Sequence, residues 1–154
     1  MSDDLRALED WVAPLLAQLT PQQRNTLARK VGQGLRRTQA ARIAAQQAPD
    51  GNAYTPRKPP PGTKARAKKG ALRRAMFSKL RTAKHLKVQL TDEGAAVGFL
   101  GRTARIARVH QEGLRDRVEP GGPDYTYPAR PLLGFTAQER EAIRDLVLAH
   151  ITQS

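Results

Sequence analysis

The sequence predicts an α+β protein with N-terminal helices, a small antiparallel sheet including a hairpin near 84–100, and a C-terminal helix. Three observations predict this class. Apolar residues recur every three or four positions up to Gln47 and again after Thr136, which is the period of an amphipathic helix. Apolar and polar residues alternate between Leu86 and Phe99, as in strands. A basic, proline-rich stretch at about 48–70 separates these regions and fits neither element.

The first helix begins with acidic residues, at the end where the helix dipole favours negative charge. Pro14 lies inside the apolar pattern and should kink or end this helix. Its apolar stripe consists of Leu5, Leu8, Val12, Leu15, Leu16 and Leu19.

A second helix should start at Thr20-Pro21-Gln22-Gln23, which combines an N-cap, a proline at the first helical position and a capping-box partner. It should run to about Gln47. Gly32 and Gly34 each weaken it by about 1 kcal/mol relative to alanine and so suggest close packing. Its apolar stripe is Leu27, Val31, Leu35, Thr38 and Ile43.

The middle of the chain is expected to be an extended basic arm or loop at about 48–70. Residues 48–52 have turn chemistry, and the prolines within 54–62 exclude both a helix and the interior of a sheet. A short helix is expected at 72–80, with Leu72, Met76, Phe77 and Leu80 as its apolar positions.

The second half of the chain should hold the hairpin, a helix over 103–112 and a final helix after Thr136. Gly113 supplies a helix stop, and Thr136-Ala-Gln-Glu139 is a second capping box. Short strands are expected at 114–118 and 125–127. With 154 residues, we expect one domain covering 1–154.

Composition narrows the class of protein. Cysteine is absent, so disulfides and thiolate metal sites are excluded and assembly in a reducing cytoplasm is allowed. No apolar run approaches the roughly 20 residues that a membrane span needs, and the acidic N-terminus does not resemble a signal peptide. We expect no membrane partner.

The positive charge is concentrated in one part of the chain. The net charge is +13, and residues 21–91 carry 18 Lys or Arg against the single Asp50. Such a block favours a polyanion, either nucleic acid or an acidic protein surface. The candidate phosphate-contacting residues, which as an alternative form only a solvated charged loop, are Arg57, Lys58, Lys64, Arg66, Lys68, Lys69, Arg73 and Arg74.

Catalysis and cofactor binding have no support in the sequence. His85, His110 and His150 are far apart, without a second ligand at metal-binding spacing. An acid–base pair of His110 with Glu112 is disfavoured, since residues two apart on a helix face different ways. We therefore expect a structural His110, no cofactor, no metal and no enzyme activity.

Arg130 is a candidate interface residue because its backbone is stiffened by Pro128 and Pro131. One interpretation is an ion pair inside the fold. The other is a contact with a neighbouring subunit or an acidic partner, in which His110 and Pro131 would take part.

Several separated motifs resemble the phage virion morphogenesis family, the tail completion proteins of contractile-tailed bacteriophages. The strongest are Thr103-Ala-Arg-Ile-Ala-Arg-Val-His-Gln-Glu-Gly113, Leu114-Arg-Asp-Arg-Val118 and Tyr127-Pro-Ala-Arg-Pro-Leu-Leu-Gly134. Upstream, Arg42-Ile-Ala-Ala-Gln-Gln47, Pro49-Asp-Gly51, Tyr54-Thr-Pro-Arg-Lys58 and Met76-Phe-Ser-Lys-Leu-Arg81 are also similar. The likeness covers nearly the whole chain.

The resemblance implies a non-enzymatic virion component that completes the tail and enables it to join the DNA-filled head. It also implies an α+β subunit of a homo-oligomeric ring at the neck, contacting other phage neck and tail proteins. The protein would be in the host cytoplasm during assembly and afterwards in the virion. Basic residues would face passing double-stranded DNA, and the arm would reach over a neighbour. The alternative is a stand-alone basic nucleic-acid-binding protein, although helix-turn-helix, zinc-finger and stacking signatures are missing.

Overall fold

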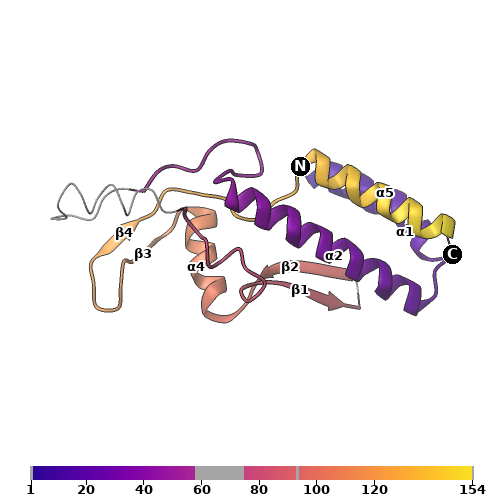
Figure 1. Ribbon diagram of the computed structural model, residues 1–154, viewed down its shortest axis with the longest axis horizontal. Helices are drawn as coiled ribbons and strands as arrows, with labels where there is room; N and C mark the ends of the chain where they lie inside the picture. Colours follow the sequence, from indigo (N-terminus) through magenta and orange to yellow (C-terminus); the bar gives the residue numbers. More distant parts are fainter. Residues whose placement is uncertain (1, 58–74, 93, 154) are drawn as a thin grey trace. The chain divides into compact units, whose positions relative to one another are not determined.

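The computed structural model describes residues 2–57, 75–92 and 94–153 (Figure 1). Its elements are α1 (Ser2–Leu16), α2 (Pro21–Ala44), β1 (Leu86–Thr91), β2 (Gly94–Phe99), α4 (Gly101–Glu112), β3 (Arg115–Arg117), β4 (Asp124–Thr126) and α5 (Ala137–Gln153). The strands of the described residues form two hairpins, β1 with β2 and β3 with β4. The predicted α+β class, with helices at both ends, is confirmed.

The chain divides into two compact units. Unit 1 consists of Met1–Thr38, Lys87–Gly98 and Phe135–Ser154, and unit 2 of Gln39–Leu86 and Phe99–Gly134. Helix α2 and the β1–β2 hairpin contribute residues to both units. Each unit has its own cluster of buried apolar side chains.

The core of unit 1 is built from three helices. Val12 of α1, Leu27 of α2 and Val147 of α5 are buried together with Leu19, which follows α1. Partly buried neighbours from the same apolar stripes pack around them: Leu8, Leu16, Val31, Ile143, Leu146 and Ile151. The stripes predicted for the first and last helices therefore do face this core.

Both predicted capping boxes are present. The backbone N–H of Gln23 donates to Thr20 Oγ1 at 3.2 Å, and the N–H of Thr20 donates to Gln23 Oε1 at 2.9 Å. Thr136 and Glu139 make the same reciprocal pair at the start of α5, with both distances 3.0 Å. Glu139 Oε1 also accepts a 2.7 Å hydrogen bond from Thr38 Oγ1. Thr38 is thus exposed and polar in its contacts, and its predicted place in an apolar stripe is wrong.

Gly32 allows α2 and the hairpin to approach closely within unit 1. A Cβ at this position would lie 2.5 Å from Val88 Cγ1 and 3.3 Å from Ala95 Cβ. At Gly34 nothing lies within 4 Å of that position. Close packing is therefore confirmed for Gly32 and wrong for Gly34.

The end of α2 differs from the prediction. Helix α2 ends at Ala44 rather than near Gln47, because Gln46 has a φ of 59° and its side-chain Nε2 donates to Ile43 O at 2.8 Å. This side chain takes up a carbonyl that a continuing helix would have used. Pro14 lies inside α1, two residues before the helix ends at Leu16.

The core of unit 2 gathers Ile43, Ala48, Tyr54, Met76, Leu80, Ala107 and Leu132. Helix α4 ends as predicted at Gly113, whose φ of 68° is left-handed. The β3–β4 hairpin pairs antiparallel, with Asp116 opposite Tyr125, so both short strands are confirmed, the first with narrower bounds and the second shifted by one residue.

The expectations for residues 48–80 are only partly testable. Residues 76–80 form turns instead of the expected helix, and Phe77 has a φ of 64° that an α-helix cannot accommodate. Residues 72–74 and the 58–70 part of the arm lie outside the described residues. Within 48–57, Ala48 and Tyr54 are buried in the core of unit 2, so an arm is not confirmed for this part.

Candidate functional site

The segment Tyr127–Gly134, here called the tract, is extended chain that belongs to neither hairpin. Polar backbone groups of such a segment need hydrogen-bond partners when they are buried. In unit 2, side chains from α2, α4 and residues 46–56 provide many of them.

Arg130 joins the tract to the segment that follows Tyr54. The residue is only 5% exposed. Nε donates to Thr55 O at 2.7 Å and Nη2 donates to Pro56 O at 3.2 Å, while the backbone N–H donates to His110 O at 2.7 Å. Burial lowers the pKa of Arg130 from its ordinary value. Its partners are carbonyls rather than the carboxylate of an ion pair.

Gln111 holds the next part of the tract through both ends of its amide. Oε1 accepts from the backbone N–H groups of Leu132 and Leu133 at 2.8 and 2.9 Å, and Nε2 donates to Leu133 O at 2.9 Å. Gln46 binds Met76 in the same two-way manner, at 2.8 and 2.9 Å. Each glutamine amide thus satisfies backbone N–H and C=O groups that a neighbouring strand would satisfy in a sheet.

Two further donors fix the tract. Tyr54 Oη donates to Pro131 O at 3.0 Å, and Arg42 Nη2 donates to Gly134 O at 3.1 Å. Burial raises the pKa of Tyr54 to about 12, with the charge of Arg42 opposing this shift, so the phenol stays a donor at neutral pH.

Close backbone approach also defines the tract. A Cβ at Gly113 would lie 2.9 Å from Ala129 N, and one at Gly134 would lie 2.6 Å from Pro49 Cγ. The motifs that contain these residues therefore meet in unit 2, although they are far apart in the sequence.

Aromatic rings form a continuous row beside the tract. Their order is Tyr54, Phe77, His110, Tyr127 and Tyr125, with centroid separations of 5.6, 4.9, 4.9 and 4.9 Å. Each neighbouring pair meets edge to face, the arrangement that ring quadrupoles favour.

His110 is in the middle of this row and is neutral at pH 7. Burial lowers its pKa to about 4, and the charges of Arg130 and Arg57 act in the same direction. Its buried Nδ1 has no hydrogen-bond partner within 2–57, 75–92 and 94–153. Glu112 bonds Arg108 instead, at 3.3 Å, so no acid–base pair with His110 forms.

Some of the predicted site residues lie together in the structure, and others lie outside the described residues. His110, Arg130 and Pro131 are brought together in unit 2, where Arg130 is buried and the other two are partly buried. Their role at a subunit interface stays a prediction. Of the phosphate-contacting candidates only Arg57 is described, and it is exposed. The others, which lie outside the described residues, are Lys58, Lys64, Arg66, Lys68, Lys69, Arg73 and Arg74.

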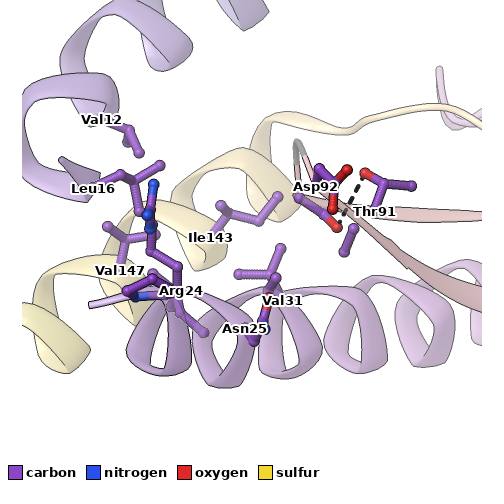
Figure 2. Close-up of a pocket in the computed structure, with 14 residues that line it drawn as sticks. Val12, Leu16, Arg24, Asn25, Val31, Thr91, Asp92, Ile143 and Val147 are labelled. Carbon is purple, nitrogen blue, oxygen red and sulfur yellow. Dashed lines mark hydrogen bonds between the residues drawn. The ribbon is translucent and has the colours of Figure 1, made fainter. Parts of the chain in front are cut away.

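A separate pocket of about 480 Å³ lies in unit 1. Figure 2 shows its floor of apolar side chains from α1, α2 and α5, including Val12, Val31 and Val147. Thr91 and Asp92 of the hairpin and Arg24 of α2 also line it. Thr91 Oγ1 donates to Gly94 O at 3.4 Å. Most of its lining is apolar, with Asp92 and Arg24 as the charged residues.

The described residues contain no group of three or more histidines, cysteines, aspartates or glutamates that could hold a metal ion. No described helix combines the length and apolar character that crossing a membrane requires. The tract and its neighbours instead form a hydrogen-bonded frame made by separated motifs of unit 2.

This chain belongs to the phage virion morphogenesis family, whose sequence model matches residues 3–152. The resemblance inferred from the motifs is confirmed. A relative of this chain, tail completion protein S of Escherichia phage P2, is 37% identical over 150 residues, which cover 97% of this chain and 98% of the relative. No solved structure matches the chain.

Sequence reasoning missed the two glutamines, the aromatic row and the distribution of charge on α2. Gln46 and Gln111 give no signal, because glutamine on a helix is ordinarily solvated. The aromatic residues are too far apart in sequence to predict a row. The charge on α2 has a signal, since its described range contains basic residues and no acidic ones.

Proposed function

We propose that this chain is a structural protein of phage tail assembly, which completes the tail and enables stable joining of head and tail. The similarity to tail completion protein S of phage P2 carries this proposal, because it runs over 97% of this chain and 98% of that protein. A match of that extent favours the same role for the whole chain rather than for a shared fragment. We propose no enzymatic step.

The finer proposal is a homo-oligomeric ring subunit at the neck, in contact with other neck and tail proteins. The protein would act in the host cytoplasm during assembly and remain in the virion. A neck subunit needs surfaces of fixed shape, and the hydrogen-bonded tract supports this proposal. Because Arg130 is buried, it would contribute to a subunit contact by holding Pro131 and its neighbours in shape.

The test is deletion of the gene in its phage, followed by electron microscopy of the lysate. We expect DNA-filled heads and unattached tails, and restoration of infectious particles when the gene is supplied in trans. Normal infectious particles from the deletion phage would refute the proposal.

The ring is tested separately by size-exclusion chromatography with light scattering, alone and with purified tails. Discrete oligomers in either preparation support it. A monomer that adds to tails as single copies would contradict the ring while leaving tail completion intact.

The second candidate is a stand-alone nucleic-acid-binding protein, which the net charge of +13 favours. It predicts infectious particles in the deletion phage together with tight DNA binding by the isolated protein. The deletion phage therefore distinguishes the two candidate functions.

A further inference from the structure

Helix α2 concentrates positive charge on one element of the fold. Every charged residue of this helix is basic: Arg24, Arg29, Lys30, Arg36, Arg37 and Arg42. With 3.6 residues per turn, Arg29, Lys30, Arg36 and Arg37 surround Gln33 on one side of the helix. We call these four residues the basic face of α2, and all four belong to unit 1.

This face is opposite the side of α2 that enters the core. Leu27 is buried and Val31 is partly buried, and both positions are on the other side of the helix from Gln33. Arg29, Lys30 and Arg37 are exposed, and Arg36 is half-buried at the edge. The charged groups are therefore accessible along about 12 Å of helix, at about 1.5 Å per residue.

No ion pair with a carboxylate of the described chain neutralises the basic face. Ion pairs of the described residues include Arg105 with Asp116, Arg108 with Glu112, and Arg115 with Asp124, and none of these involves the basic face. Four clustered cations without anions repel one another, and a bound polyanion removes that repulsion.

The composition of the face favours phosphates over a protein partner. Protein interfaces are centred on apolar or aromatic anchors and are depleted of lysine. The exposed side of α2 around Gln33 presents Arg, Lys, Gln and Thr26 and no apolar anchor. A DNA duplex carries one charge per about 1.7 Å of its axis, so a 12 Å face covers several phosphates.

We propose that the basic face of α2 binds the phosphate backbone of duplex DNA without sequence preference. This proposal rests on the proposed function, since a neck protein would lie beside the DNA that passes from head to tail. Aromatic side chains for base stacking are missing from this face. The contact should therefore depend on the phosphate charges and not on the base sequence.

The experiment measures binding of the full chain to a fluorescent duplex of random sequence by anisotropy at several salt concentrations. The test variant is Arg29→Gln/Lys30→Gln/Arg36→Gln/Arg37→Gln. The matched control, Lys79→Gln/Arg81→Gln/Lys84→Gln/Lys87→Gln, removes the same charge from exposed residues outside this face. Circular dichroism checks that both variants keep their helices, as exposed glutamine allows.

We expect the α2 variant to lose about 100-fold in affinity near 50 mM salt, and its salt slope to fall by about 3 to 4, as for loss of four phosphate contacts. The control should stay within about threefold of the wild type. No binding by the wild type would overturn the proposal. So would equal losses in both variants, which would indicate net charge alone, or a loss confined to the control.

Self-association is the remaining outcome to separate. If the wild type forms oligomers without DNA, and the α2 variant is monomeric with unchanged DNA binding, the face contacts a second copy and the proposal is wrong. Failure of the DNA contact leaves the deletion phenotype unaffected, so it is distinguishable from failure of the proposed function.

Discussion

At the residue scale, Arg130 shows how a charged side chain can serve the interior of a protein. The neighbouring prolines predict a stiff backbone, whereas its acceptors come from a segment far away in the sequence. Carbonyl oxygens satisfy the guanidinium without a second charge, since arginine offers five donors in a fixed geometry. The residue could be singled out from sequence, whereas its partners could not.

Arg130→Ala should destabilise the isolated subunit by about 3 kcal/mol, because hydrogen bonds to a charged donor are lost and carbonyls of Thr55 and Pro56 lose their partner. Urea unfolding followed by circular dichroism measures this change. The matched control is Arg105→Ala, whose side chain is 76% exposed in its pair with Asp116 and should cost at most about 1 kcal/mol. Equal stabilities of the two variants would favour a role for Arg130 only in assembly.

His110 should make stability depend on pH. Its pKa is about 4 in the folded chain and 6.5 ordinarily, so the unfolded chain binds the proton more readily. The free energy of unfolding should therefore fall as pH decreases from 6.5 to 4. His110→Gln should flatten this part of the profile, measured by urea unfolding at each pH. The same slope in His110→Gln as in the control His85→Gln would show that other groups cause the dependence.

At the element scale, helix starts were predictable and one helix end was not. Thr20 and Thr136 begin helices because their capping boxes are local in sequence. The end of α2 depends on the left-handed Gln46, whose side chain binds Met76, 30 residues away. The turns at 76–80 likewise replaced a predicted helix, since tertiary contacts of Phe77 override local propensity.

Gly32 and Gly34 provide a matched test of helix packing. Gly32→Ala should destabilise the protein by about 1 to 3 kcal/mol, because Val88 is β-branched and cannot easily move its Cγ1 away. Gly34→Ala should stabilise it by up to about 1 kcal/mol, since alanine is the better helix former and nothing obstructs its methyl group. Thermal unfolding of both variants measures the difference. A stabilised Gly32→Ala variant would contradict the close approach of α2 and the hairpin.

At the scale of the whole molecule, the chain forms two compact units, and helix α2 contributes residues to both. The expectation of a single domain over 1–154 stays a prediction, and the intrinsic chromophores allow a direct test. Trp11 is in unit 1, whereas Tyr54, Tyr125 and Tyr127 are in unit 2. Each unit therefore reports its own unfolding.

We expect the tryptophan and tyrosine signals to change at the same urea concentration, because α2 contributes residues to both units and should couple them. Tryptophan emission and tyrosine difference absorbance measure the two transitions. A tyrosine transition well separated from the tryptophan transition would show two independently folding domains. Gly34→Ala, which alters only unit 1, should then move the tryptophan transition alone.

The hydrogen bonds of the tract also determine when the chain can finish folding. Arg42 and Gly134 are 92 residues apart, Tyr54 and Pro131 are 77 apart, and Arg130 and Thr55 are 75 apart. Contacts of such long sequence separation close large loops and form late. A nascent chain on the ribosome cannot make them until nearly all of it has emerged. Translation itself thus delays completion of unit 2 until Gly134 has emerged from the ribosome.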